Sequence, residues 1–123
     1  MLKESSIPFS HPDQKLIEAL HELSSKRCGC VLIVDDELRL LGIFTDGDLR
    51  RAIESKGAQA LQIQMKDLMN PSPKKIEREI LAFDAMREME KDPTRPITVL
   101  PVIHQKKVVG LLRMHDILQA GLH

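Results

Sequence analysis

The stretch Gly42-Ile43-Phe44-Thr45-Asp46-Gly47-Asp48-Leu49-Arg50-Arg51 predicts an apolar strand that ends directly at the start of a helix. Thr45 and Asp48 have the spacing of a capping box, in which two side chains satisfy amide groups of the first helical turn. The same side chains could bind a sugar and a phosphate, because a carboxylate accepts from vicinal hydroxyls and helix-start amides attract anions. Both interpretations stay open and are compatible, since one threonine can do both.

Upstream of this junction the sequence predicts a helix and a hairpin. The spacing of hydrophobic residues favours a helix that begins with a capping box at Ser10-His11-Pro12-Asp13 and ends near Lys26. Two apolar runs, Gly29 to Val34 and Arg39 to Phe44, should be paired strands that flank the polar turn Asp35-Asp36-Glu37.

Downstream, the sequence predicts a short helix and then a second set of similar elements. A helix over 47–54 should bury Leu49, Ala52 and Ile53, and Gly57 should end it. The second set comprises a helix over 79–90, strands over 97–103 and 107–113, and a helix over 114–120. Pro101 inside a strand indicates a sheet edge or a bulge, because proline donates no ladder hydrogen bond.

An internal repeat relates the two halves of the chain. At a shift of 68 positions, without a gap, Gly42 aligns with Gly110, Asp48 with Asp116, and Val31-Leu32-Ile33-Val34 with Val99-Leu100-Pro101-Val102. We therefore predict an α+β fold of two β-α-β-β-α repeats, residues 1–62 and 63–123. Their sheets should pack around a pseudo-two-fold axis, and their strand-to-helix junctions should face each other across clefts.

Composition excludes several classes of function. The chain has 123 residues, enough for one domain with a core, and that core is aliphatic because there are three Phe and no Trp or Tyr. Eighteen basic residues balance eighteen acidic ones, so neither nucleic acid nor an anionic membrane is an expected partner. Apolar runs are only strand-length and the first residues resemble no signal peptide, so we expect neither a membrane span nor secretion.

The two cysteines indicate a reducing compartment. Cys28 and Cys30 flank one glycine, and a disulfide across so short a span would be strained. Two thiols without a nearby histidine also fall short of a metal site. Buried reduced thiols are the simplest interpretation, which favours a cytoplasmic protein.

Catalytic chemistry finds little support in the residues. Asp46 and Asp48 could hold Mg²⁺, but no third acidic ligand or glycine-rich phosphate loop accompanies them. A nucleophilic cysteine would need a positioned base, and both cysteines fall near a predicted core strand. We therefore expect no catalytic residue, no metal and no required cofactor.

The whole chain resembles a tandem pair of cystathionine-β-synthase (CBS) domains, also called a Bateman module. The resemblance lies in Gly42-Ile43-Phe44-Thr45 with Asp48, in Gly110-Leu111 with Asp116, and in Asp67-Leu68-Met69-Asn70-Pro71. It implies nucleotide binding in the clefts between repeats, with the Thr–Asp pair on phosphate and ribose and the backbone of the first strand on the base. The implied ligand-binding positions are Cys30, Val31, Thr45, Asp46 and Asp48, and, in the second repeat, Thr98, Val99, Arg113, His115 and Asp116.

A narrower resemblance points to the C-terminal CBS pair of D-arabinose-5-phosphate isomerases. It is carried by residues 42–51 (GIFTDGDLRR), by Met114-His115-Asp116-Ile117-Leu118, and by the ending Ala120-Gly121. That family begins the synthesis of 3-deoxy-D-manno-octulosonate (Kdo) for lipopolysaccharide or capsule and carries catalysis on an N-terminal sugar-isomerase domain. No such domain precedes the repeats here, so the resemblance implies an excised regulatory portion or a stand-alone relative.

The second repeat departs from the family pattern. Arg113 stands in place of the threonine, and Met114 and His115 replace Asp46 and Gly47. Arg113 could bind a phosphate and His115 a sugar, or they could be a surface arginine and a hydrogen-bonded core histidine.

Two functions remain open at this point. The first is a sensor of a nucleotide or nucleotide sugar, with CMP-Kdo, AMP, ADP or ATP as candidate ligands. An anionic sugar acid such as that in CMP-Kdo would suit Arg113 and His115, and Arg50 or Arg51 if they reach the cleft. The second is a structural module that braces an isomerase oligomer. Because members of the family commonly dimerise, the resemblance also implies a flat homodimer. Its interface would be formed by the helices that carry Leu49, Ile53, Ile117 and Leu118.

Overall fold

The computed structural model describes residues 6–26, 28–78 and 99–113. Contacts group them into two compact units, Ser6–Pro73 and the described residues from Lys74 onward. This division lies beyond the repeat boundary expected after residue 62, because the segment 64–70 belongs to the first unit. Gln64 pairs there with Lys15, and Asn70 pairs with Ile43.

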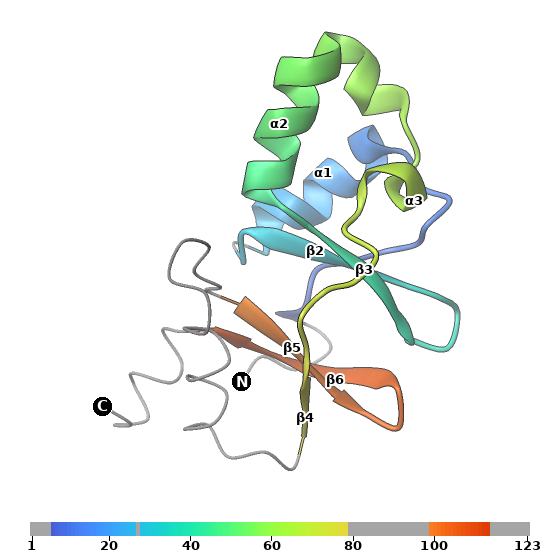
Figure 1. Ribbon diagram of the computed structural model, residues 1–123, viewed down its shortest axis with the longest axis vertical. Coiled ribbons are helices and arrows are strands. Elements are labelled where there is room, and N and C mark those ends of the chain that lie inside the picture. The colour runs from blue at the N-terminus through green and yellow to red at the C-terminus, as the bar shows by residue number, and fades with distance from the viewer. Residues whose placement is uncertain (1–5, 27, 79–98, 114–123) are drawn as a thin grey trace. The chain divides into compact units, whose positions relative to one another are not determined.

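The first unit is built on a three-stranded sheet in the order β1-β2-β3 (Figure 1). Strand β1 (Phe9–Ser10) runs parallel to β2 (Cys30–Val34), and β2 runs antiparallel to β3 (Leu40–Thr45). The predicted hairpin and its polar turn are therefore confirmed. The central strand β2 is buried along its whole length, which explains why its sequence is continuously apolar.

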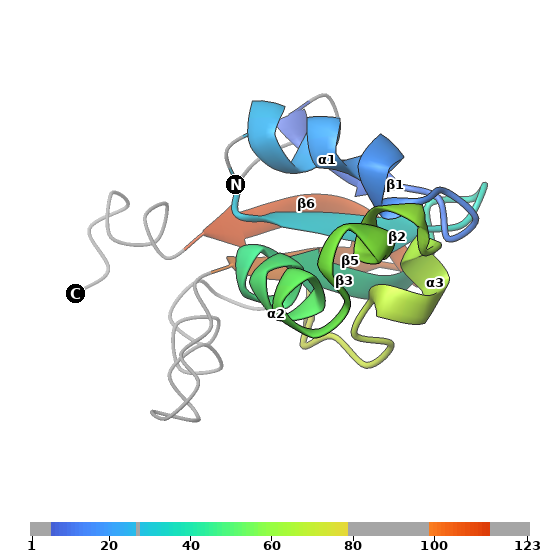
Figure 2. The ribbon, with the colours of Figure 1, turned by 90° about the horizontal axis from the view of Figure 1, so that it is seen from above.

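Helices pack on the face of this sheet that carries Val31, Ile33 and Phe44 (Figures 1 and 2). They are α1 (Leu16–Ser25), α2 (Asp46–Lys56), the 3₁₀ helix η2 (Gly57–Gln62) and the single turn α3 (Met65–Leu68). The shared core comprises Leu16, Ala19, Leu23, Val31, Ile33, Phe44, Ala60 and Met65. Aliphatic residues supply nearly all of it, as the composition predicts.

The predicted start of the first helix was wrong. Ser10 lies in β1, and α1 begins only at Leu16, because pairing with β2 holds Phe9 and Ser10 in an extended conformation. The side chain of Gln14 organises the intervening loop, since its Oε1 accepts from the Ser10 hydroxyl at 3.0 Å and from the His11 amide at 2.9 Å. The helix start is capped by Glu18, whose carboxylate accepts from the Lys15 amide at 3.1 Å.

The second helix, α2, is two residues longer at its C-terminal end than expected, and it is less buried. Gly57 caps its end, as predicted. Leu49 and Ala52 are partly buried against the core, but Ile53 is 40% exposed, so the prediction that Ile53 is buried was wrong. Ile53 therefore lies outside the stripe of α2 residues that packs against the core.

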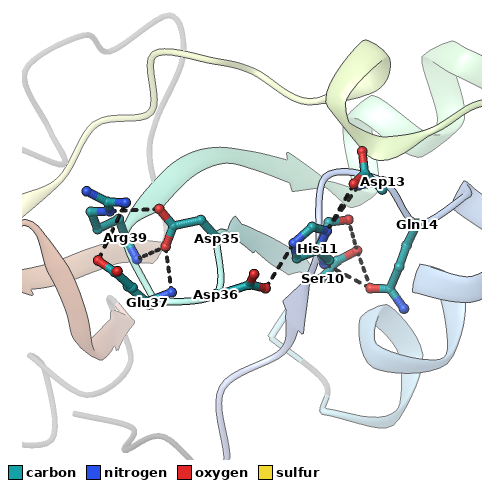
Figure 3. A network of polar contacts seen from close by, with 8 residues as sticks. All are labelled: Ser10, His11, Asp13, Gln14, Asp35, Asp36, Glu37 and Arg39. Atoms are coloured by element: carbon teal, nitrogen blue, oxygen red, sulfur yellow. Dashed lines mark hydrogen bonds and ion pairs between the residues drawn. The ribbon is translucent and has the colours of Figure 1, made fainter.

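Polar side chains connect the loop before α1, which contains His11, to the turn of the β2–β3 hairpin (Figure 3). His11 Nε2 lies 3.2 Å from Asp36 Oδ1, and Asp35 accepts from the Arg39 backbone at 2.9 Å and from its Nε at 2.7 Å. The contact of His11 with Asp36 links the entry of α1 to the far end of the β2–β3 hairpin, and those of Asp35 with Arg39 close the hairpin turn itself.

The second unit repeats the sheet of the first. Strand β4 (Ile76–Glu77) runs parallel to β5 (Val99–His104), and β5 runs antiparallel to β6 (Lys107–Arg113), in the order β4-β5-β6. Pro101 lies just before a register shift in β5, and β4 pairs only with Val102 and Ile103, which accounts for the tolerated proline. The helices expected over 79–90 and 114–120 lie outside the described residues.

The two hairpins differ by one residue, so the gapless repeat alignment was wrong across β5. Gly42 pairs with Ile33, nine positions away, whereas Gly110 pairs with Val102, eight positions away. The difference arises in the turns. Gln105 and Lys106 form a two-residue loop with positive φ at both positions (53° and 69°), which type I′ hairpins require. The first hairpin has the longer turn closed by Asp35 and Arg39.

Candidate functional site

The junction of β3 and α2 is a complete capping box. Thr45 is the N-cap residue, and its Oγ1 accepts from the Asp48 amide at 3.2 Å. In return, Asp48 Oδ2 accepts from the Thr45 amide at 2.9 Å and from the Thr45 hydroxyl at 3.0 Å. The capping interpretation of this motif is thus confirmed, and both side chains are held in one defined orientation.

A third residue, Arg51, completes the arrangement. Its Nη2 donates to Asp48 Oδ1 at 2.6 Å, one helical turn further along α2. The Asp48 side chain is 26% exposed and that of Arg51 is 63% exposed, so the carboxylate faces solvent from a fixed position while the guanidinium can move. The sequence indicated Arg51 only as a cation that would suit an anionic sugar acid if it reached the cleft. The three-residue spacing from Asp48 was the signal that could have predicted this pair.

Asp46 meets the loop that precedes β2. Its backbone amide donates to the carbonyl of Gly29 at 3.0 Å. Gly29 has φ +73°, and a Cβ at this position would lie 3.4 Å from Asp46 Oδ2. A glycine therefore suits the backbone here, and the Asp46 carboxylate stays exposed beside the capping box.

The backbone groups of Val31 and Cys30 face opposite edges of β2. The Leu32 amide donates to Pro8 on the β1 side, so by alternation the backbone groups of Val31 face Phe44 in β3. Those of Cys30 face the opposite side, before the short β1 begins its pairing at Leu32. Both residues are fully buried, so the binding of a base by either of them stays a prediction.

In the second unit, Arg113 occupies the place that Thr45 has in the first. It ends β6 and pairs with Val99, as Thr45 ends β3 and pairs with Cys30. Arg113 and Val99 are both partly buried. The other residues predicted here, Thr98, His115 and Asp116, lie outside the described residues.

Neither nucleophilic nor metal chemistry finds support in the described residues. Burial, the neighbouring Cys28 and the Asp46 carboxylate together raise the pKa of Cys30 to about 12, the reverse of an activated thiol. Cys28 is likewise buried, as predicted, and neither cysteine forms a disulfide. Within 6–26, 28–78 and 99–113, no three side chains of His, Cys, Asp or Glu gather in a way that could hold a metal ion.

We predict that Cys30 resists alkylation at pH 8 in the folded protein. With a pKa of about 12 against an ordinary value of 9.0, its thiolate population at pH 8 is about a thousandfold lower than in the unfolded chain. The variant Cys28→Ser leaves Cys30 as the one cysteine, so labelling by iodoacetamide with and without urea isolates its reactivity. Equal labelling in both conditions would refute the burial of this thiol.

The raised pKa also predicts a loss of stability at alkaline pH. The folded state keeps the Cys30 proton up to about pH 12, while the unfolded chain releases it near pH 9. The stability that this proton contributes is therefore complete below pH 9 and is lost as the pH rises toward 12. Urea midpoints measured from pH 7 to 11 should fall above pH 9, and Cys30→Ala should flatten that decline.

Comparison with known proteins places the chain in a family. The CBS domain family model matches residues 4–55 and 65–123. The chain belongs to the CBS domain family and contains a pair of these domains, one match for each repeat.

Curated relatives align with nearly all of the chain. An uncharacterised protein of Chlamydia pneumoniae is 39% identical over 125 residues, which cover 99% of this chain and 37% of the relative. The arabinose 5-phosphate isomerase KdsD of Yersinia pestis is 39% identical over 118 residues, which cover 96% of this chain and 35% of the isomerase. The chain thus spans about a third of the length of these relatives.

Solved CBS structures share the fold. The crystal structure of CBSX2 in complex with AMP has a TM-score of 0.83 and 24% identity, and the match covers 99% of this chain and 92% of that one. At this identity the likeness establishes the α+β CBS architecture alone. In the part of the chain that the structure describes, no helix is long and apolar enough to cross a membrane.

Proposed function

We propose that this chain is the nucleotide-sensing CBS pair of an arabinose-5-phosphate isomerase, and that Thr45 and Asp48 bind the ligand. The observation that carries the proposal is the oriented Thr45–Asp48 pair at the start of α2, in a chain that belongs to the CBS family. The 39% identity to KdsD supports the link to that isomerase, and the AMP-bound CBSX2 supports a nucleotide as the class of ligand.

The geometry of Asp48 leaves one acceptor position for a sugar hydroxyl. Each carboxylate oxygen can accept about two hydrogen bonds, and Thr45 already fills both positions on Oδ2. On Oδ1 one position holds Arg51 and the other remains for an incoming hydroxyl. The helix start and the nearby guanidinium add an environment that favours the negative charge of a phosphate.

Among nucleotides, we propose CMP-Kdo as a feedback ligand. The isomerase family resembled by the sequence begins Kdo synthesis, and CMP-Kdo is the activated end product of that route. Its anionic sugar acid would suit the guanidinium of Arg51 beside the Thr45–Asp48 pair. AMP, ADP and ATP are the competing candidates.

A second function is favoured by one specific observation. The capping box is complete without any ligand, because the Thr45 and Asp48 side chains satisfy each other. The CBS pair could therefore brace an isomerase oligomer without binding a small molecule. Such a module would need the same residues for helix stability alone.

A thermal-shift screen separates the two functions. We expect one or more of AMP, ADP, ATP, S-adenosylmethionine, CMP and CMP-Kdo to raise the melting temperature in a saturable manner, because a ligand that binds the folded state stabilises it. A saturable shift with CMP-Kdo alone would identify the feedback ligand. Absence of a shift with every compound, confirmed by calorimetry, would leave the bracing function.

The chain by itself should not isomerise arabinose 5-phosphate. In the relatives the aligned region is about a third of the protein. The isomerase family that the sequence resembles carries catalysis on a separate sugar-isomerase domain. A turnover assay should give the same rate as a mock preparation. Ketose formation above that background would overturn this assignment.

We further propose that the chain forms a homodimer through its helices. Among the residues expected to line such an interface, Ile53 is exposed on α2 and Leu49 is partly buried, while Ile117 and Leu118 lie outside the described residues. Sedimentation at micromolar concentration should give twice the monomer mass. Ile53→Asp should shift the distribution toward monomer, and a monomer in the unmodified protein would refute the proposal.

A further inference from the structure

We propose that Arg51 makes the Thr45–Asp48 site select for a phosphate on its ligand. Arg51 would release Asp48 when ribose hydroxyls bind there and would then pair with the phosphate of the same molecule. This inference rests on the proposed function of the site and adds to it a residue that decides between nucleotide and nucleoside.

The first step follows from the hydrogen bonds on Asp48. Thr45 occupies both acceptor positions of Oδ2, and Arg51 occupies one position of Oδ1 at 2.6 Å. A ribose presents two neighbouring hydroxyl donors, and only one acceptor position is open. Binding of both hydroxyls to the carboxylate therefore requires Arg51 to leave. Its side chain is 63% exposed, so departure into solvent is unhindered.

The second step follows from where the guanidinium lies. A Cβ at Gly47 would be 3.3 Å from both Nη1 and Nη2 of Arg51. Arg51 therefore reaches back over the first turn of α2, where Gly47 presents no side chain. The positive end of the helix and a planar guanidinium meet at this point, and both favour a phosphate, which the guanidinium can bind with two parallel hydrogen bonds.

The exchange has a consequence for selectivity. With a nucleotide, the Asp48 carboxylate gains hydroxyl donors and the guanidinium gains a phosphate, so both charges keep a partner. With an uncharged nucleoside, the Asp48–Arg51 ion pair is broken and the guanidinium gains no new partner. Arg51 thus favours the phosphorylated ligand and opposes the unphosphorylated one.

The test compares ligands that differ only in the phosphate. Binding of AMP and adenosine, and of CMP and cytidine, is measured by calorimetry on the full chain and on Arg51→Ala, Arg51→Lys and Arg50→Ala. We expect Arg51→Ala to lower the ratio of nucleotide to nucleoside affinity by about tenfold or more, through weaker nucleotide binding and equal or tighter nucleoside binding. Arg51→Lys should fall between, because it keeps the charge without the fork.

Arg50→Ala is the matched control, since Arg50 is the adjacent exposed arginine of the same helix and its removal changes the net charge equally. The ratio of nucleotide to nucleoside affinity in Arg50→Ala should stay within about twofold of the ratio in the unmodified chain. An unchanged ratio in Arg51→Ala, or an equal loss for nucleotide and nucleoside, would overturn the inference and leave the proposed function intact. If the unmodified chain binds none of the four compounds, this inference falls, and the proposed function falls with it only if ADP, ATP and CMP-Kdo also fail to bind.

Discussion

Replacing Asp48 by alanine should abolish nucleotide binding and leave the chain folded. The proposed ribose contacts are charge-assisted hydrogen bonds, each worth roughly 1.5–3 kcal/mol, so the loss of two corresponds to a hundredfold or greater fall in affinity. The cost to stability is smaller. Asp48→Ala removes one half of the capping box with Thr45, and the loss of such a cap costs about 1 kcal/mol.

Two further variants make this experiment decisive. Thr45→Val keeps the shape but loses the hydroxyl, so it should weaken binding less than Asp48→Ala while lowering the melting temperature by a similar amount. Glu54→Ala, at an exposed position of the same helix, removes one carboxylate away from the junction and should change neither property. Calorimetry that finds the affinity of Asp48→Ala unchanged would refute the site. Lower melting temperatures in both junction variants, without ligand binding in any protein, would favour the bracing function.

The second large effect is expected at Gly42, where two segments of backbone nearly touch. A Cβ at this position would lie 2.5 Å from Met69 Sδ and 2.8 Å from the Asn70 carbonyl oxygen. That carbonyl accepts from the Ile43 amide at 3.0 Å, and the Asn70 amide donates back to the Ile43 carbonyl at 2.8 Å. Any side chain at position 42 must therefore push the 69–70 segment away from β3 and strain both bonds.

We expect Gly42→Ala to lower the free energy of unfolding by about 2–4 kcal/mol, from overpacking together with two weakened backbone hydrogen bonds. Gly47→Ala is the matched control, because a Cβ there meets only the movable end of Arg51 and alanine favours a helix. It should be neutral or slightly stabilising. Urea denaturation of the two variants measures the difference, and a change below about 0.5 kcal/mol in Gly42→Ala would contradict the close approach.

Much of the fold could be predicted because the sequence carries it locally. The hairpin of β2 and β3, the cap at Thr45, the helix stop at Gly57 and the repeated sheet all follow from motifs or periodicity within a few residues. The start of α1 could not be predicted in this way. Ser10 to Asp13 has a good capping sequence, but pairing of Phe9 and Ser10 with β2 outweighs that local preference.

The register of the second hairpin and part of the candidate site were also beyond local reasoning. Gln105 and Lys106 both adopt positive φ, a conformation that a glycine would normally have indicated in the sequence. The turn that they form is one residue shorter than the first, and this shifts β5 by one position in the repeat alignment. For the site, Thr45 and Asp48 could be chosen from their spacing. The contact between Arg51 and Asp48 was not predicted, because a spacing of three residues allows such a pair without requiring it.

The bridge between Asn70 and Ile43 affects how the first repeat can be separated from the second. The backbone amide and carbonyl of Ile43 point away from β2, and both form hydrogen bonds with the backbone of Asn70. A fragment cut at residue 62 would leave β3 with a bare hydrogen-bonding edge, which another chain can extend by strand addition. We therefore expect a fragment of residues 1–62 to aggregate and one of residues 1–73 to remain dispersed, a difference that light scattering can detect.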